Sequence, residues 1–208
     1  MGVMMDIESC LKIIARYRTD EVVVTTMTER LFWPSLSRSA ADFCFTDPMG
    51  TGPGLAMGIA LARPDIRVWL ISGDGGLVMY LGSLVTIVDA YPSNMVFFLV
   101  HDNMYGLPGS PIPGAGKVDF YAMGQAAGLK DVFSVTSLDE LDSVMPRIKA
   151  GLGGPTLVVM DTDWKTSREA VGGPKEYARR VTSPQATERF GRNGVRNLRS
   201  ALTRIDVH

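Results

Sequence analysis

The stretch "IRVWLISGDGGLVMYLGSLVTIVDAYPSNMVFFLVHDNMYG", residues 66–106, decides the fold of this chain. Its two continuous apolar runs, Ile66–Ser72 and Met95–His101, are typical of parallel strands that are covered on both faces. Between them, Leu77–Ala90 has the length and composition of a helix. A strand, a helix and a second strand in succession predict a parallel sheet with helices packed against it.

The same alternation continues on both sides of this stretch. Besides the elements above, the sequence predicts helices over Ile7–Tyr17, Gly54–Leu61, Phe120–Leu129 and Leu138–Ala150, and strands over Glu21–Met27, 132–137 and 155–163. Arg30–Phe45 is rich in aromatic residues, has no clear period and is expected to be irregular. The predicted fold class is α/β, with a parallel sheet and helices on both faces.

Charge divides the chain into two parts. The 208 residues carry a formal net charge of −1, but residues 1–163 hold 11 Lys/Arg against 18 Asp/Glu, whereas residues 164–208 hold 10 against 4. We therefore expect one domain over 1–163, followed over 164–208 by a linker and a basic helical tail. One apolar stripe of that helix is predicted at Val195, Leu198, Leu202 and Ile205. This stripe either packs on its own domain or docks on another subunit.

Composition gives no sign of a nucleic-acid or membrane partner. The net charge is close to zero, and no apolar stretch reaches the ~18 residues that a membrane span requires. The N-terminus lacks the pattern of a signal peptide. The two cysteines, Cys10 and Cys44, form no metal-binding or disulfide framework and are expected to be reduced. These features favour a cytoplasmic protein.

Polar side chains follow both strands of residues 66–106. Asp74 comes just after the first strand, and Asp102 and Asn103 follow the second. Because the carboxyl ends of parallel strands meet at one edge of a sheet, we expect these side chains to lie close together. The turn Gly73–Gly76 frees backbone N–H groups that suit a diphosphate, and hard oxygen ligands suit Mg²⁺. The sequence therefore predicts a Mg²⁺ ion and a diphosphate at this edge, with a backbone carbonyl of the "NMYG" turn as a further ligand.

The motif "GDG", then 26 residues, then "DN" resembles the cofactor motif of thiamine diphosphate-dependent enzymes. The resemblance implies that Gly73, Asp74, Gly75 and Gly76 hold the diphosphate. It also implies that Asp74, the side chain of Asn103 and the carbonyl of Tyr105, which Gly106 follows, bind Mg²⁺. Asp102 stands where the family has a first Asn.

A second segment resembles the decarboxylase branch of that family. "DPMGTGPGLAMGIALARPDIRVWLISGDG" begins at Asp47 and has the layout of a tight turn, a helix of small residues and the strand before "GDG". By resemblance, Met49 is the wedge that bends the cofactor, Gly50 completes the turn, and the carbonyl of Asp47 accepts a hydrogen bond from the aminopyrimidine. Asp47 and Pro48 replace the usual Gly and Ser, which alters the pocket wall.

Within this branch the chain looks most like the phosphonopyruvate and sulfopyruvate decarboxylases, above all the beta-type subunit of the latter. The run Met79–Thr86 and the Asp-Asn pair are similar to theirs, and the resemblance covers about 22–163. It implies a small 2-oxo acid as substrate. The loop "LPGSPIPGAG", residues 107–116, departs from their pattern, so the identity of that acid is open.

The residue that activates the cofactor in this family is a Glu on a separate pyrimidine-binding domain, and that domain has no counterpart in the sequence. The resemblance therefore implies an alpha-type partner subunit that brings the Glu, in a hetero-oligomer built on dimers. No catalytic residue is assigned to this chain. His101 is expected to be a buried, hydrogen-bonded residue rather than a catalytic one. Carboligation of the same substrates, or a cofactor-binding module without activity, are the alternatives.

Overall fold

The computed structural model describes residues 5–45, 48–106, 108–165 and 191–204, together with 169, 172, 176, 179–180, 182 and 184. A six-stranded sheet with strand order β2-β1-β3-β4-β8-β7 forms its centre, and every neighbouring pair in it is parallel. The strands are β1 (Val22–Thr25), β2 (Asp42–Cys44), β3 (Val68–Gly73), β4 (Met95–His101), β7 (Asp131–Val135) and β8 (Thr156–Asp161). The predicted α/β class is confirmed.

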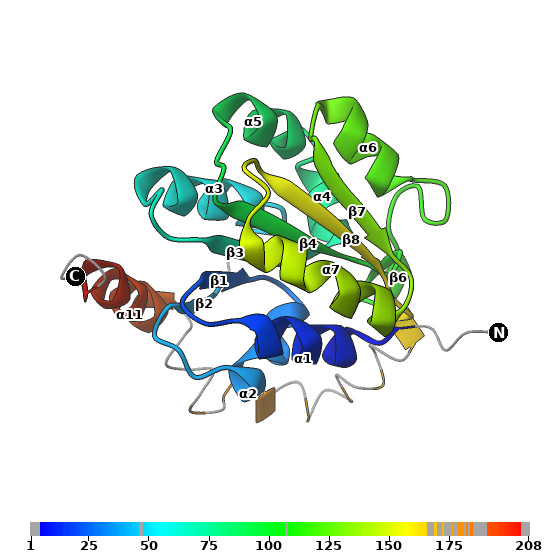
Figure 1. Cartoon of the computed structure of the whole chain (residues 1–208). Helices are drawn as coiled ribbons and strands as arrows, with labels where there is room; N and C mark the ends of the chain where they lie inside the picture. The colour runs from blue at the N-terminus through cyan, green and yellow to red at the C-terminus, as the bar shows by residue number, and fades with distance from the viewer. Residues whose placement is uncertain are drawn as a thin grey trace.

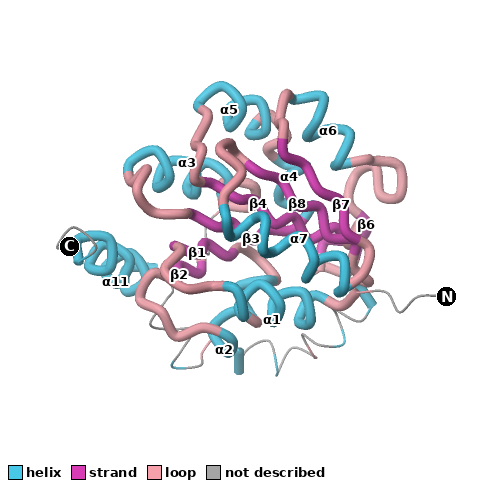
Figure 2. Tube along the Cα trace, viewed as in Figure 1, coloured by secondary structure: helices cyan, strands magenta, loops and turns pink. Residues whose placement is uncertain are grey.

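Helices cover both faces of the sheet (Figures 1 and 2). One face carries α3 (Gly52–Ala62), α4 (Asp74–Met79), α5 (Ser83–Ala90) and α6 (Phe120–Ala127). The other carries α1 (Ile7–Tyr17), η1 (Glu29–Leu31), α2 (Trp33–Leu36) and α7 (Leu138–Ala150). Side chains of β3 alternate between the two cores, since Leu70 packs on the first side and Trp69 and Ile71 on the second.

Two expectations about local structure are wrong. Leu77–Ala90 is not one helix: α4 starts at Asp74 and ends at Met79, and α5 begins at Ser83. The break lies at a tight tertiary contact, because a Cβ on Gly50 would lie 2.5 Å from the ring of Tyr80. Arg30–Phe45 is not irregular throughout either, since it contains α2 and the strand β2.

The basic tail forms the helix α11 (Gly191–Arg204), which lies beside the edge strand β2 (Figure 1). Leu198 of the predicted stripe is buried in the same core as Phe43 of β2, and Leu202 packs against that core. Arg63 donates a hydrogen bond to the carbonyl of Leu202. Val195 is exposed, and Ile205 lies outside the described residues.

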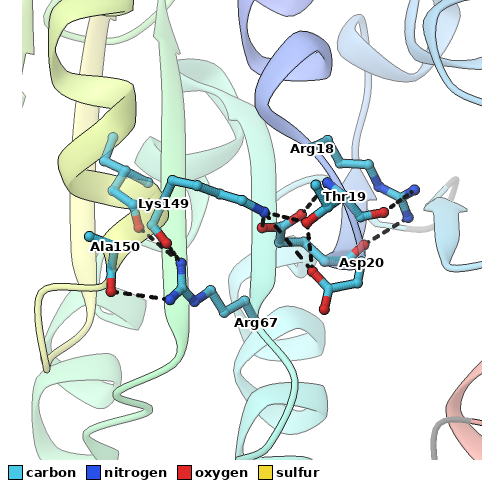
Figure 3. Close-up of polar contacts among 8 residues, drawn as sticks. Arg18, Thr19, Asp20, Arg67, Lys149 and Ala150 are labelled. Atoms are coloured by element: carbon cyan, nitrogen blue, oxygen red, sulfur yellow. Dashed lines mark hydrogen bonds and ion pairs between the residues drawn. The ribbon is translucent and has the colours of Figure 1, made fainter.

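A polar cluster joins elements at the amino-terminal edge of the sheet (Figure 3). Arg67 donates hydrogen bonds to the carbonyls of Lys149 and Ala150, at the carboxyl end of α7. Lys149 forms an ion pair with Glu21, whose side chain is 1% exposed, and donates to the hydroxyl of Thr19. The cluster ties α7 to the start of β1 and to β3.

Within the described part of the chain, none of the helices combines the length and the apolar character needed to cross a membrane.

Candidate functional site

The candidate site lies at the carboxyl edge of the sheet, opposite the polar cluster of Figure 3. From β1 the chain runs outward to β2, then returns to form β3 on the other side of β1. Ligands of open α/β sheets bind in the crevice at such a reversal of strand order. A pocket lies there between three segments, 27–31 after β1, 73–76 at the end of β3, and 102–106 with 108 after β4.

Most of the predicted cofactor-binding residues line this pocket or lie beside it. Those that line it are Met49, Gly73, Gly75, Gly76, Tyr105 and Gly106. Gly50 borders a neighbouring hollow beside Tyr80 and α5. Asp74 and Asn103 belong to the turns that form the walls, and Asp47 lies outside the described residues. The assignment of these residues to a cofactor stays a prediction.

Asp74 links the two turns, as its position after a parallel strand predicted. Its carboxylate is 1% exposed, and Oδ2 accepts hydrogen bonds from the backbone N–H groups of Asp102 (3.1 Å) and Asn103 (2.7 Å). Among the described residues, Oδ1 has no hydrogen-bond partner. A buried carboxylate oxygen without a partner is costly, and a bound cation would satisfy it. This geometry fits the proposed divalent ion.

Asn103 adopts a left-handed backbone conformation with φ of +63°. Asn tolerates this region better than most residues, and strained backbone is concentrated at functional sites. Its Oδ1 accepts a hydrogen bond from the N–H of Gly116 (2.7 Å), and its carbonyl accepts one from Ile112 (3.0 Å). The carbonyl of Tyr105 similarly accepts from Gly109 (2.8 Å). Both oxygens that are predicted to bind the cation therefore accept hydrogen bonds from the loop that follows them.

The described residues include no group of three His, Cys, Asp or Glu side chains suited to a metal ion. A cation at Asp74 would consequently take its other ligands from amide or carbonyl oxygens and from the bound molecule. This is the usual situation of Mg²⁺, which protein groups hold together with phosphate oxygens and water.

At two positions other groups approach the backbone so closely that only glycine fits. A Cβ on Gly75 would lie 2.7 Å from the ring of Tyr105, so that ring rests directly on the turn after β3. Gly50 has φ of +89°, and a Cβ there would lie 2.8 Å from the carbonyl of Gly76. The backbone of the turn is therefore held between Tyr105 and Gly50.

Negative charge is concentrated beneath the pocket. Burial raises the pKa of Asp74, although the N–H of Asn103 opposes the shift. Burial, followed by the charge of Asp74, raises the pKa of Asp102 to about 7. Because these carboxyls repel each other, a cation or a hydrogen-bond donor is favoured there over a further anion.

His101 forms a contact with Asp161 and is influenced by the charge of Asp74. Its Nδ1 lies 2.6 Å from Oδ1 of Asp161, whereas its Nε2 has no hydrogen-bond partner among the residues that the structure describes. Burial acts to lower the pKa of His101, but the hydrogen bond to Asp161 and the charges of Asp161 and Asp74 raise it overall. One ring nitrogen is thus hydrogen-bonded as expected, and the other is not.

Glu29, which was not among the residues predicted from the sequence, also lines the pocket. Its side chain is 2% exposed, and burial raises its pKa well above the ordinary value. The available signal was a charged residue soon after a buried strand, at the edge where ligands bind. Helical or strand periodicity gives no information about such a residue, because η1 has only three residues, Glu29–Leu31.

The variant Asp102→Asn should be more stable than the wild type at pH 8, by on the order of 2 kcal/mol. The folded-state pKa of Asp102, about 7, exceeds the ordinary 3.8, so this group favours folding at low pH and loses that contribution as pH rises between the two values. Asn keeps the oxygen that accepts from the N–H of Met104. Urea unfolding at pH 5 and pH 8 measures the effect. An equal pH dependence in both proteins would contradict it.

Comparison with known proteins agrees with this geometry. The family described as "Thiamine pyrophosphate enzyme, C-terminal TPP binding domain" matches residues 22–160. The chain belongs to this family. As a member of the thiamine pyrophosphate enzymes, it carries the cofactor-binding domain across the whole segment from β1 to β8.

Its relatives within the family include decarboxylases. A phosphonopyruvate decarboxylase of Streptomyces viridochromogenes is 31% identical over 186 residues, which is 84% of this chain and 46% of that protein. A sulfopyruvate decarboxylase subunit beta of Methanococcus maripaludis is 29% identical over 125 residues, 59% of this chain and 66% of that subunit. The chain thus spans less than half of the first relative and just under two thirds of the second.

A solved structure confirms the fold. A putative thiamin diphosphate-dependent enzyme from Mycobacterium smegmatis superposes with a TM-score of 0.63 at 21% identity, over 76% of this chain and 32% of that one. The thiamine pyrophosphate enzyme domain therefore corresponds to about a third of that larger chain.

Proposed function

We propose that this chain is the diphosphate-binding subunit of a thiamine diphosphate-dependent decarboxylase of a small 2-oxo acid. Asp74 carries this proposal: backbone N–H groups fix one oxygen of the buried carboxylate, and the other has no partner among the described residues. In the proposed complex that oxygen would help to hold Mg²⁺ beside the diphosphate. The relatives named as phosphonopyruvate and sulfopyruvate decarboxylases support the reaction class.

The residues of this chain would bind and orient the cofactor rather than activate it. The glycines of the turn after β3 let the diphosphate approach the backbone, and Asn103 and the carbonyl of Tyr105 would complete the protein ligands of the cation. Met49 lies on the pocket wall, where it would support the ring system. When bound, thiamine diphosphate supplies the electron sink that makes loss of CO₂ from a 2-oxo acid possible.

We further infer that a partner chain supplies the catalytic Glu. The domain matches the C-terminal part of family members, and a relative of comparable extent is named as subunit beta. The partner would be an alpha-type, pyrimidine-binding subunit, in a hetero-oligomer built on dimers. The two cysteines are free and buried, which supports a reducing, cytoplasmic location.

Calorimetric titration with thiamine diphosphate, with and without Mg²⁺, tests the cofactor assignment. We expect binding that requires the cation. Co-purification followed by assay of 2-oxo acid decarboxylation tests the split arrangement. Decarboxylation at enzymic rates by the isolated chain would contradict the need for a partner, and absence of cofactor binding under all conditions would contradict the proposed function.

A further inference from the structure

Glu29 forms part of the inner wall of the pocket on the β1 side. It begins η1, shortly after β1 ends at Thr25, and lines the pocket together with Gly73, Gly75 and Asp102. A Cβ on Gly73 would lie 3.2 Å from its Oε1, so the carboxyl lies directly against the end of β3. The side chain therefore lies beside the turn that is predicted to hold the diphosphate.

One of the two carboxyl oxygens of Glu29 has no hydrogen-bond partner among the described residues. Its side chain is 2% exposed, and Oε2 has no hydrogen-bond partner within residues 5–45, 48–106 and 108–165 or the other described positions. A buried polar atom of this kind costs free energy unless a ligand or water satisfies it. Because Glu29 lines the pocket, a ligand bound there would lie close to its carboxyl.

Burial and the nearby charges determine whether the carboxyl of Glu29 can donate a hydrogen bond. Asp74 and Asp102 both oppose a further negative charge, whereas Arg30 favours one, although its Nε donates to the carbonyl of Met27. Burial is the largest influence, and together these effects raise the pKa of Glu29 well above its usual range. A neutral carboxyl has an O–H group to donate. The raised pKa favours the protonated carboxyl of Glu29, which is the form that can donate a hydrogen bond to an anionic ligand.

We propose that Glu29 is a further cofactor-binding residue, which donates a hydrogen bond from its carboxyl to an oxygen of the diphosphate. This inference rests on the proposed function, because a diphosphate oxygen only accepts hydrogen bonds and the cofactor is what places it in the pocket. Glutamine at this position would keep a donor of the same length, whereas alanine would remove it. The two substitutions therefore separate the hydrogen bond from the general shape of the wall.

The test compares ligand affinity in the full chain, wild type against Glu29→Gln and Glu29→Ala, by calorimetry in the presence of Mg²⁺. The ligands are thiamine diphosphate and inorganic diphosphate. We expect Glu29→Gln to bind both within about twofold of wild type, and Glu29→Ala to bind both about tenfold more weakly, as for loss of one hydrogen bond to a charged group. Glu8→Gln, at a partly exposed position on α1, is the matched control, and thermal melting verifies that each variant is folded.

Four outcomes would overturn the inference. They are unchanged affinity in Glu29→Ala, equal weakening in Glu29→Gln and Glu29→Ala with normal melting, tighter binding in both variants, and weakening for thiamine diphosphate but not for inorganic diphosphate. If wild type binds thiamine diphosphate and one of these results appears, only the role of Glu29 fails. If wild type binds neither ligand, the proposed function fails and this inference fails with it. Should Glu29→Ala not fold, Glu29→Met, which keeps the length of the side chain but has no hydrogen-bond donor, replaces it, with the same weakening expected.

Discussion

Replacing Asp74 by asparagine is expected to weaken Mg²⁺-dependent binding of thiamine diphosphate by on the order of 100-fold or more. The substitution exchanges one carboxylate oxygen for an NH₂ group, which cannot bind a cation. The oxygen that remains still accepts from the N–H groups of Asp102 and Asn103, so the link between the two turns is kept. The variant thus removes the proposed ligand while it preserves the local structure.

Stability provides the control for this experiment. Burial raises the pKa of Asp74, which means that the charged form is disfavoured when no cation is bound. Asp74→Asn should therefore melt at or above the temperature of wild type in the absence of Mg²⁺. Asp139→Asn, at an exposed position of α7, serves as the matched change and should leave cofactor affinity unaltered. Equal Mg²⁺-dependent affinity in Asp74→Asn and wild type would disprove the ligand assignment.

The substitution Lys149→Met should destabilise the fold by about 3 kcal/mol. It leaves Glu21, which is 1% exposed, as a buried carboxylate without its ion-pair partner. The N–H of Thr19 still donates to Oε2 of Glu21 (2.8 Å), which places the expected loss at the lower end of the range for broken buried pairs. Urea unfolding monitored by circular dichroism measures the change.

Two further variants define the origin of this loss. Glu21→Gln combined with Lys149→Met removes both charges, and this double variant should recover part of the stability because no isolated buried charge remains. Lys12→Met breaks an ion pair with Glu8 on the exposed side of α1 and should change stability little. A loss below about 1 kcal/mol in Lys149→Met would show that Glu21 is stabilised by its other contacts.

The order of strands and helices could be predicted because it depends on local patterns. The continuous apolar runs of β3 and β4 indicate parallel strands, and parallel strands bring Asp74 and Asn103 to one edge without further information. The caps at Asp119 and Ser137 are also local, and each side chain accepts a hydrogen bond from the helix it precedes. These elements are determined by residues that are neighbours in sequence.

Features that depend on contacts between distant segments could not be predicted. The strand β2 has only three residues, and it is stabilised by pairing with β1 and by packing with α11. The break between α4 and α5 lies where Gly50 meets Tyr80. Glu29 is buried through the arrangement of β1 and β3, which no pattern around Glu29 reveals. For such features, tertiary structure outweighs local preference.

The position of α11 affects whether a strand from another copy of this protein can pair with the sheet. β2 is an edge strand of the sheet, and edge strands act as templates for strands from other chains. Because α11 lies beside β2, and Leu198 is buried in the same core as Phe43, a strand from another molecule has less access to this edge. The tail thereby shields the β2 edge, one of the two edges of the sheet, from strand addition, a common route to aggregation.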